Sequence, residues 1–176
     1  FQFMISKTLP RVRAQAHFYK SIIDSARNKP VTFRTLDIGG DKEVSFLKRD
    51  HEETPALGWR AIRIGLDRPA LLRYQLRALI TAAADTTLRI MFPMITNVEE
   101  FKLAKAILEK ELSRHQRNKR PMPKDIKVGT MLEVPSLVWQ LDELLPLVDF
   151  VSIGSNDLMQ FFYACDRENP KMSNRY

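Results

Sequence analysis

The sequence has few of the residues that mark several classes of protein. It contains one cysteine, Cys165, so an internal disulfide is excluded, and without a Cys-rich spacing no structural zinc site is expected. We expect Cys165 to be a free, half-buried thiol. With only 6 glycines, 44% hydrophobic and 28% charged residues in a chain of 176, a fibrous or disordered protein is excluded and a sizeable core can form.

Long hydrophobic runs are also missing. No stretch approaches the roughly 18 consecutive apolar residues that a membrane span requires, and no charged-then-apolar leader opens the sequence. We therefore expect a soluble, cytoplasmic protein that does not contact a membrane. The sequence opens at Phe1 inside the apolar stretch FQFM and ends at Tyr176 after a polar segment, so we expect it to be part of a longer protein.

Positive charge is in excess, with a formal net charge of +7 and a pI of about 9.7. Most of the excess lies in one segment, which contains Arg114, Arg117, Lys119, Arg120, Lys124 and Lys127. Such a run is typical of a solvated helix end and loop, and no aromatic side chains interleave it for base stacking. Nucleic-acid binding is therefore the least favoured function.

Short apolar segments bounded by Pro, Gly, Asp and Asn predict β-strands. They cover residues 31–38, 88–94, 127–134 and 149–153, and FQFM is expected to end a further strand. Their nearly continuous apolar character is typical of parallel strands that are covered on both faces.

Helical periodicity fills the intervals between these strands. Apolar residues three and four apart predict helices over 12–26 and 69–83, with Asp67 as the N-cap of the second. Thr96 and Glu99 have the spacing of a capping box and predict the start of another helix. Strands that alternate with helices, without a hairpin signal, predict an α/β fold built from βαβ units.

Polar side chains gather at the carboxyl ends of the predicted strands. Arg34 and Asp37 lie on or after the strand predicted at 31–38, and Glu133 lies late in the strand at 127–134. Asn156 and Asp157 follow the strand at 149–153. Because the carboxyl ends of parallel strands meet at one face, where α/β proteins hold their ligands, we expect these residues to converge.

Their chemistry predicts a metal-assisted phosphoryl-transfer site. Glu133 lies in a strand too apolar to hold an unpartnered charge, so it either forms a salt bridge with an arginine or binds a cation together with Asp157. Mg²⁺ fits a pair of carboxylates best, because water and substrate oxygens fill its other positions. Arg34 lies within a strand, and its guanidinium suits phosphate oxygens.

Other catalytic signatures are missing. The glycines at 39–40 lack the spacing of a Walker loop or a Rossmann fingerprint, and they begin a long irregular segment, 39–55, that we expect to be functional or mobile. His17, His51 and His115 are scattered and expected to be exposed, and none belongs to a Ser-His-Asp group. A phosphoryl-accepting histidine is not expected in this chain.

Six segments together identify a family that the chain resembles. They are RTLDIGGDK (34–42), PALGWRAIR (55–63), LRIMFPMI (88–95), GTMLEVPS (129–136), SIGSNDLMQF (152–161) and DR (166–167). In order and spacing they resemble the C-terminal phosphoenolpyruvate-binding domain of the Enzyme I family, the phosphoenolpyruvate-protein phosphotransferases of the bacterial phosphotransferase system. The segment MLEVPS (131–136) resembles the nitrogen-related branch of that family more closely.

The resemblance implies a (β/α)8 TIM-type barrel, of which residues 1–176 would form a partial domain with about five of the eight strands. The family binds phosphoenolpyruvate and Mg²⁺, transfers the phosphoryl group to a histidine on a separate N-terminal domain, and releases pyruvate. Through that domain the phosphate reaches a phosphocarrier protein of the HPr type, and the family forms homodimers. The phosphohistidine domain and the last barrel strands would lie outside this chain, which alone is expected to be inactive.

By position, the resemblance also assigns site residues. Glu133 and Asp157 correspond to the metal ligands, and Asn156 to a substrate contact. The residues that correspond to the phosphate-binding arginines are Arg34, Arg60 and Arg167. In the family, a cysteine acts as the general acid that protonates the pyruvate enolate, and it would lie beyond Tyr176. No catalytic residue is therefore assigned in this chain, and Cys165 does not take that role.

Two other functions remain open. One is that of a relative such as pyruvate phosphate dikinase or phosphoenolpyruvate synthase, which shares the barrel and the metal ligands but not the protein acceptor. The other is a non-catalytic regulatory or dimerisation module. The sequences TLDIGGDK and GWRAIR favour Enzyme I over the dikinase or synthase.

Overall fold

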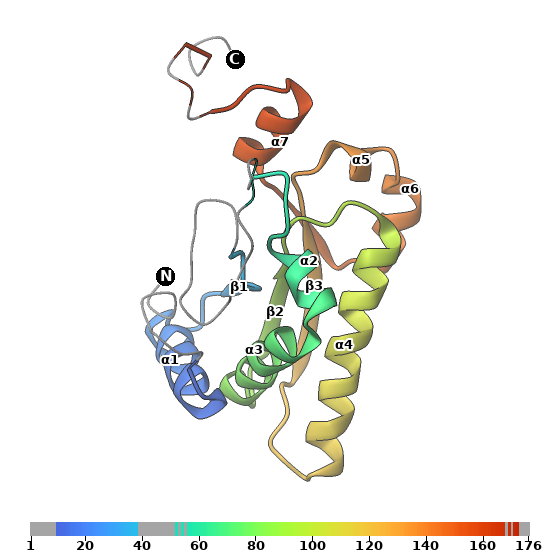
Figure 1. Cartoon of the computed structure of the whole chain (residues 1–176). Helices are drawn as coiled ribbons and strands as arrows, with labels where there is room; N and C mark the ends of the chain where they lie inside the picture. Colours follow the sequence, from blue (N-terminus) through green and yellow to red (C-terminus); the bar gives the residue numbers. More distant parts are fainter. Residues whose placement is uncertain are drawn as a thin grey trace.

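A four-stranded parallel sheet organises the chain in the computed structural model, which describes residues 10–38, 52, 54, 56–167, 169 and 171–172 (Figure 1). The strands are β1 (Thr32–Arg34), β2 (Thr87–Phe92), β3 (Asp125–Leu132) and β4 (Phe150–Ile153), and they pair side by side in chain order. Parallel pairing confirms the predicted α/β class. Sequential order is what a barrel segment requires, while the complete (β/α)8 barrel stays a prediction.

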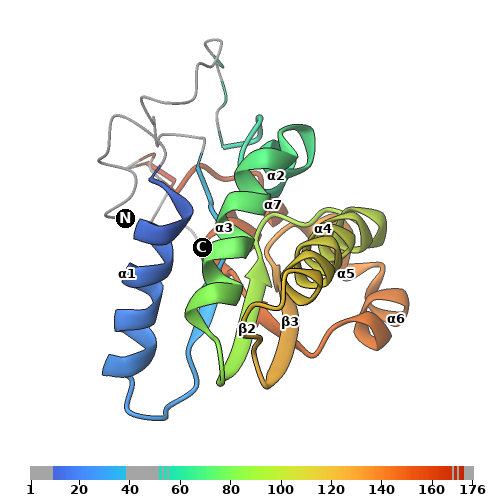
Figure 2. The same cartoon turned by 90° about the horizontal axis from the view of Figure 1, so that it is seen from below.

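Helical segments precede the first described strand, connect each strand to the next and follow the last. They are α1 (Val12–Ser25), α2 (Ile62–Asp67), α3 (Pro69–Ala82), α4 (Val98–Arg117), α5 (Pro135–Val138), α6 (Leu141–Leu144), the 3₁₀ helix η2 (Leu145–Leu147) and α7 (Ser155–Phe162). Figures 1 and 2 show α1, α3 and α4 side by side along the sheet. Because α7 directly follows β4, it lies at the carboxyl end of the strands, as Figure 1 shows.

The core lies between the sheet and this helical layer. Alternate residues of β2, including Ile90 and Phe92, are fully buried with Leu76 and Leu79 of α3. Phe92 also meets Phe101 of α4 edge to face, with ring centroids 6.0 Å apart. Each large side chain buried in this way contributes about 1.5–3 kcal/mol, so the helical layer is firmly attached to the sheet.

Both N-cap residues predicted from the sequence are wrong by one position, although α3 begins at Pro69 as predicted. Helix α3 begins at Pro69 after Arg68, and Asp67 instead ends α2, where its Oδ2 accepts a hydrogen bond of 2.7 Å from Trp59 Nε1. Proline suits the first helical position because it has no N–H to satisfy and its fixed φ matches that of the helix.

Helix α4 is capped by Asn97, not by Thr96. The Asn97 Oδ1 accepts a hydrogen bond of 2.9 Å from Glu100 N, and Thr96 donates from both its backbone N and its Oγ1 to the Glu100 carboxylate. The arrangement resembles a capping box, but the carboxylate is that of Glu100 instead of Glu99, and it accepts from the residue before the N-cap.

The first described strand is shorter than predicted. Only Thr32–Arg34 of the predicted 31–38 forms β1, although Thr35 N still donates to Met91 O at 2.9 Å. From there the backbone leaves the sheet, and Leu36 N donates to the side-chain oxygen of Gln75 on α3 at 2.7 Å. A side chain thus replaces the strand partner.

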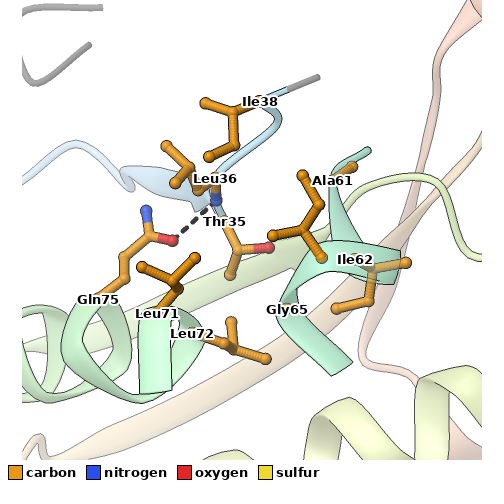
Figure 3. A pocket seen from close by; sticks show the side chains of 10 residues that line it. Thr35, Leu36, Ile38, Ala61, Ile62, Gly65, Leu71, Leu72 and Gln75 are labelled. Carbon is orange, nitrogen blue, oxygen red and sulfur yellow. Dashed lines mark hydrogen bonds between the residues drawn. The ribbon is translucent and has the colours of Figure 1, made fainter. Parts of the chain in front are cut away.

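Gln75 lies behind the end of β1, beside a cavity of about 20 Å³ that is lined mainly by apolar residues (Figure 3). Figure 3 shows Thr35, Leu36 and Ile38 on one side of this cavity and residues of α2 and α3 on the other. The Gln75 Nε2 also donates to the hydroxyl of Tyr19 on α1 at 3.2 Å. One buried amide therefore joins two helices to the backbone after β1.

Two expectations about exposure are wrong. His115 is only 2% exposed, and Cys165 is buried instead of half-buried, although its thiol is free as predicted. His17 is exposed, while His51, the stretch FQFM and most of the segment 39–55 lie outside the described residues. Across the described part of the chain, every helix is too short or too polar to pass through a lipid bilayer.

Candidate functional site

An open cleft of about 340 Å³ lies at the carboxyl end of the sheet, beside the first turn of α7. It is lined by Arg34, Asp37, Arg60, Met131, Glu133, Ile153, Gly154, Ser155, Asn156, Asp157 and Arg167. All six residues assigned from the sequence, and Asp37, therefore come together although more than a hundred positions separate the first from the last. Arg34 and Glu133 lie at strand ends, and Asn156 and Asp157 lie in the first turn of α7. Arg60 lies just before α2, and Arg167 lies after α7.

Arg60 forms the centre of the cleft's ion pairs. Its Nη2 lies 3.1 and 3.0 Å from the two carboxylate oxygens of Asp37, and its Nε lies 3.3 Å from Oδ1. A longer contact of 3.5 Å joins the same Nη2 to Asp157 Oδ2. Burial lowers the pKa of Arg60, but the two carboxylates more than offset it and the net shift is upward.

Two further arginines flank this centre at the rim of the cleft. Arg167 Nη1 donates to Asp157 Oδ1 at 3.1 Å, and Arg34 Nη1 lies 3.5 Å from Asp37 Oδ2. Both guanidiniums are nearly half exposed, whereas both carboxylates are buried. Positive charge therefore faces solvent at the mouth of the cleft, where an anionic ligand would enter.

Glu133 is the most deeply buried carboxylate of the cleft, with 1% of its surface exposed. It follows the last residue of β3, and its Oε1 accepts a hydrogen bond of 2.6 Å from Met94 N. Burial raises the pKa of Glu133, the Met94 hydrogen bond opposes this, and the charges of Asp157 and Asp37 raise it further. Within the described residues Glu133 forms no ion pair, so the salt-bridge alternative finds no support there.

The backbone around these side chains is unusual at three positions. Ala61, next to Arg60, has a φ of 51°, and Met94, which donates to Glu133, has a φ of 57°. Such angles cost a non-glycine residue about 1–2 kcal/mol and tend to persist at functional sites. A Cβ on Gly154 would lie 2.4 Å from Glu133 Oε2, so only glycine lets the turn before α7 pass over this carboxylate.

The donor set fits a divalent cation held by two carboxylates. In the part of the chain that the structure describes, no group of three or more His, Cys, Asp or Glu could enclose a metal ion. A cation at Glu133 and Asp157 would therefore take its remaining ligands from water and substrate, which is how Mg²⁺ is commonly bound. Glu133 is suited to this, since a nearby cation would offset the cost of its buried negative charge.

Sequence reasoning found these residues unevenly. Asp37 was noted at a strand end without a role, although it holds two arginines. Arg60 was assigned by resemblance alone, because its segment has no strand or helix pattern that marks it. For Ile153 and Ser155 no sequence signal exists beyond their position at or just after the end of a predicted strand.

A family model described as "PEP-utilising enzyme, PEP-binding domain" matches residues 1–176, the whole chain. The chain belongs to this family. It is 45% identical over 176 residues to the phosphoenolpyruvate-protein phosphotransferase of Priestia megaterium and 44% identical to that of Bacillus subtilis strain 168. A protein of the same name from Buchnera aphidicola subsp. Baizongia pistaciae is 46% identical over 178 residues. Each match covers 100% of this chain and 31% of the relative.

Membership gives the cleft a context. The family description names phosphoenolpyruvate as the ligand of this kind of domain, and the cleft combines guanidinium groups with buried carboxylates, as binding of a phosphorylated carboxylic acid requires. Formally, three arginines and three carboxylates balance at the cleft. A cation and an anion that enter together would preserve this balance, whereas an anion alone would not.

Proposed function

We propose that this chain is the phosphoenolpyruvate- and Mg²⁺-binding domain of a phosphoenolpyruvate-protein phosphotransferase. The observation that carries the proposal is the alternation of Arg34, Asp37, Arg60, Asp157 and Arg167 around one cleft, with Glu133 buried beside them. The names of the similar proteins support the same activity.

Each group has a distinct role in the proposal. Arg34, Arg60 and Arg167 bind phosphate oxygens, and Asn156, exposed in the first turn of α7, donates to the substrate. To bind the phosphate, Arg60 gives up its contact to Asp157, which at 3.5 Å is longer than its contact to Asp37. Mg²⁺ held by Glu133 and Asp157 would supply positive charge beside the transferring phosphate.

The proposed reaction breaks the phosphorus–oxygen bond of phosphoenolpyruvate and forms a phosphorus–nitrogen bond to a histidine. The electron pair of the broken bond stays on the leaving enolate, which takes up a proton and becomes pyruvate. We place the acceptor histidine on a separate domain. Cys165 does not line the cleft and has its Sγ 3.7 Å from Met172 O, so the proton is not assigned to it.

The wider organisation follows the same proposal. The four strands would belong to a complete (β/α)8 barrel in a cytoplasmic homodimer, and a phosphocarrier of the HPr type would accept the phosphate through the histidine domain. The segment MLEVPS favours the nitrogen-related branch.

Calorimetric titration tests the ligand assignment. Phosphoenolpyruvate is titrated into the whole protein with and without Mg²⁺, and Glu133→Ala and Asp157→Ala are compared with Asp142→Asn, an exposed carboxylate outside the cleft. We expect binding that needs Mg²⁺ in the wild type and in Asp142→Asn, and a loss of at least tenfold in both cleft variants. Normal Mg²⁺-dependent binding by either cleft variant would show that its metal assignment is wrong.

A second assay separates the alternative activities. Pyruvate release that depends on added phosphocarrier protein supports the phosphotransferase, whereas release that depends on a nucleotide and is indifferent to the carrier points to the dikinase or synthase. Tight self-association without any ligand binding would instead select the non-catalytic module.

A further inference from the structure

A second concave surface lies among α1, α3 and α4 and shares no residue with the cleft. It consists of two adjoining cavities of about 260 and 370 Å³, which have Val12, Arg13, His115 and Arg120 in common. We call it the arginine pocket, formed by Arg13, Arg77, Arg114, His115, Asn118 and Arg120. Figures 1 and 2 show the three helices that supply it, with α4 descending toward the amino-terminal end of β3.

The arginines of this pocket are not all balanced by carboxylates. The fully buried Glu111 forms salt bridges with Arg73 and Arg77 of α3. Its negative charge is therefore already paired. Arg13, Arg114 and Arg120 form no ion pair with a carboxylate in the described part of the chain. Three guanidinium groups therefore border the same concave surface without a counter-charge from the described residues.

Further features of the pocket favour an anion. The first turn of α1 begins at Val12 and has no acidic residue and no side-chain cap, so its backbone N–H groups add positive character beside Arg13. The carboxyl end of α4 acts in the opposite direction, but a helix end carries about half an elementary charge, less than one arginine. His115 does not add to this positive character, because burial and the guanidinium of Arg120 lower its pKa, and its Nε2 lies 3.1 Å from Thr81 Oγ1.

We propose that the arginine pocket binds a small phosphorylated metabolite, a function that goes beyond phosphoenolpyruvate binding in the cleft. Planar guanidiniums and the amide of Asn118 provide the donors that phosphate oxygens require. Cavities of this size suit a small ligand. An extended nucleic acid is disfavoured because no Phe, Tyr or Trp lines either cavity for base stacking.

Binding of pyrophosphate, measured by calorimetry on the whole protein without divalent cations, tests the proposal. The double variant Arg13→Ala/Arg120→Ala removes two exposed guanidiniums, and Arg117→Ala is the matched control, since Arg117 is a basic residue of the last turn of α4 that does not line the pocket. We expect the double variant to weaken binding at least tenfold and Arg117→Ala to change it less than twofold. Equal losses in both would reveal a general charge effect and overturn the proposal.

Additional arms identify the site and the ligand class. Arg60→Ala should leave pyrophosphate binding unchanged, and a loss confined to that variant would place the ligand in the cleft and overturn the second site without affecting the proposed function. Citrate tests whether phosphate is needed, so equal affinity for citrate would contradict the ligand class. Binding of a short single-stranded oligonucleotide in the absence of pyrophosphate binding would likewise refute a small-ligand pocket.

Discussion

Replacing Gln75 by leucine tests how the cleft is held by groups that do not line it. The Gln75 side chain accepts from Leu36 N at 2.7 Å and donates to Tyr19 Oη at 3.2 Å, and only 9% of its surface is exposed. Leucine has a similar volume but can make neither hydrogen bond. The backbone it releases lies between Arg34 and Asp37, which both line the cleft.

The magnitude follows from the two contacts. A part-buried N–H that loses its acceptor costs about 1–3 kcal/mol, and the weaker contact to Tyr19 adds about 0.5–1.5 kcal/mol. The added apolar surface of leucine returns about 1 kcal/mol. We therefore expect the free energy of unfolding to fall by about 0.5–3.5 kcal/mol. For a chain of this size, each kcal/mol lowers the midpoint of thermal unfolding by roughly 2–4 °C.

Urea denaturation with Tyr19→Phe as the matched control measures this effect. Tyr19→Phe removes the contact to Gln75 Nε2 and leaves the bond to Leu36 N, so it should cost less than Gln75→Leu. We also expect Gln75→Leu, but not Tyr19→Phe, to weaken phosphoenolpyruvate binding several-fold. Unchanged stability of Gln75→Leu, or a larger loss in Tyr19→Phe, would refute the idea that this amide holds the end of β1.

Two further predictions concern α4. Asn97→Ala should cost about 1 kcal/mol in urea denaturation because it removes the cap of Glu100 N, and a larger loss in Thr96→Ala would contradict the cap assignment. Burial and Arg120 lower the pKa of His115, so the unfolded chain takes up a proton that the folded chain does not, and the free energy of unfolding should fall as the pH drops below about 6.5. His115→Asn should flatten this part of the stability curve, whereas His17→Asn, on an exposed site, should leave it in place.

Much of the fold can be predicted because parallel strands and packed helices repeat simple patterns. The apolar runs located all four described strands, and the apolar spacing located α1 and α3 to within one residue at each end. Strand ends were less predictable, since β1 stops after Arg34 where Gln75, far along the chain, takes over the hydrogen bonding. No local pattern contains that information.

The burial of His115 shows a signal that could have been used. The residues buried on α4 include Phe101, Ala104, Leu108, Glu111 and His115, which continue a strict spacing of three and four along one helix face. Charged and polar side chains on such a face are normally assigned to solvent. The exception depends on Arg73 and Arg77 of another helix, which form ion pairs with Glu111 and make its burial possible.

The cleft residues could be grouped from the sequence, but their pairing could not. Convergence of Arg34, Glu133 and Asp157 follows from strand ends alone, as a parallel sheet brings them to one edge. The contact of Arg60 with both carboxylate oxygens of Asp37 depends on the path of the chain between these residues, which the sequence does not reveal. Only the resemblance drew attention to Arg60.

We expect stability and ligand binding to be coupled at the end of β1, because neighbouring residues there line either the cleft or the small cavity behind it. Arg34 and Asp37 line the cleft, whereas Leu36 and Ile38 line the small cavity beside Gln75 (Figure 3). A shift of this backbone that relieved packing around the cavity would also move the carboxylate that holds Arg60. Substitutions in the apolar layer behind β1 should therefore alter ligand binding without touching the ligand, since productive electrostatic contacts depend on positioning to within about 0.5 Å.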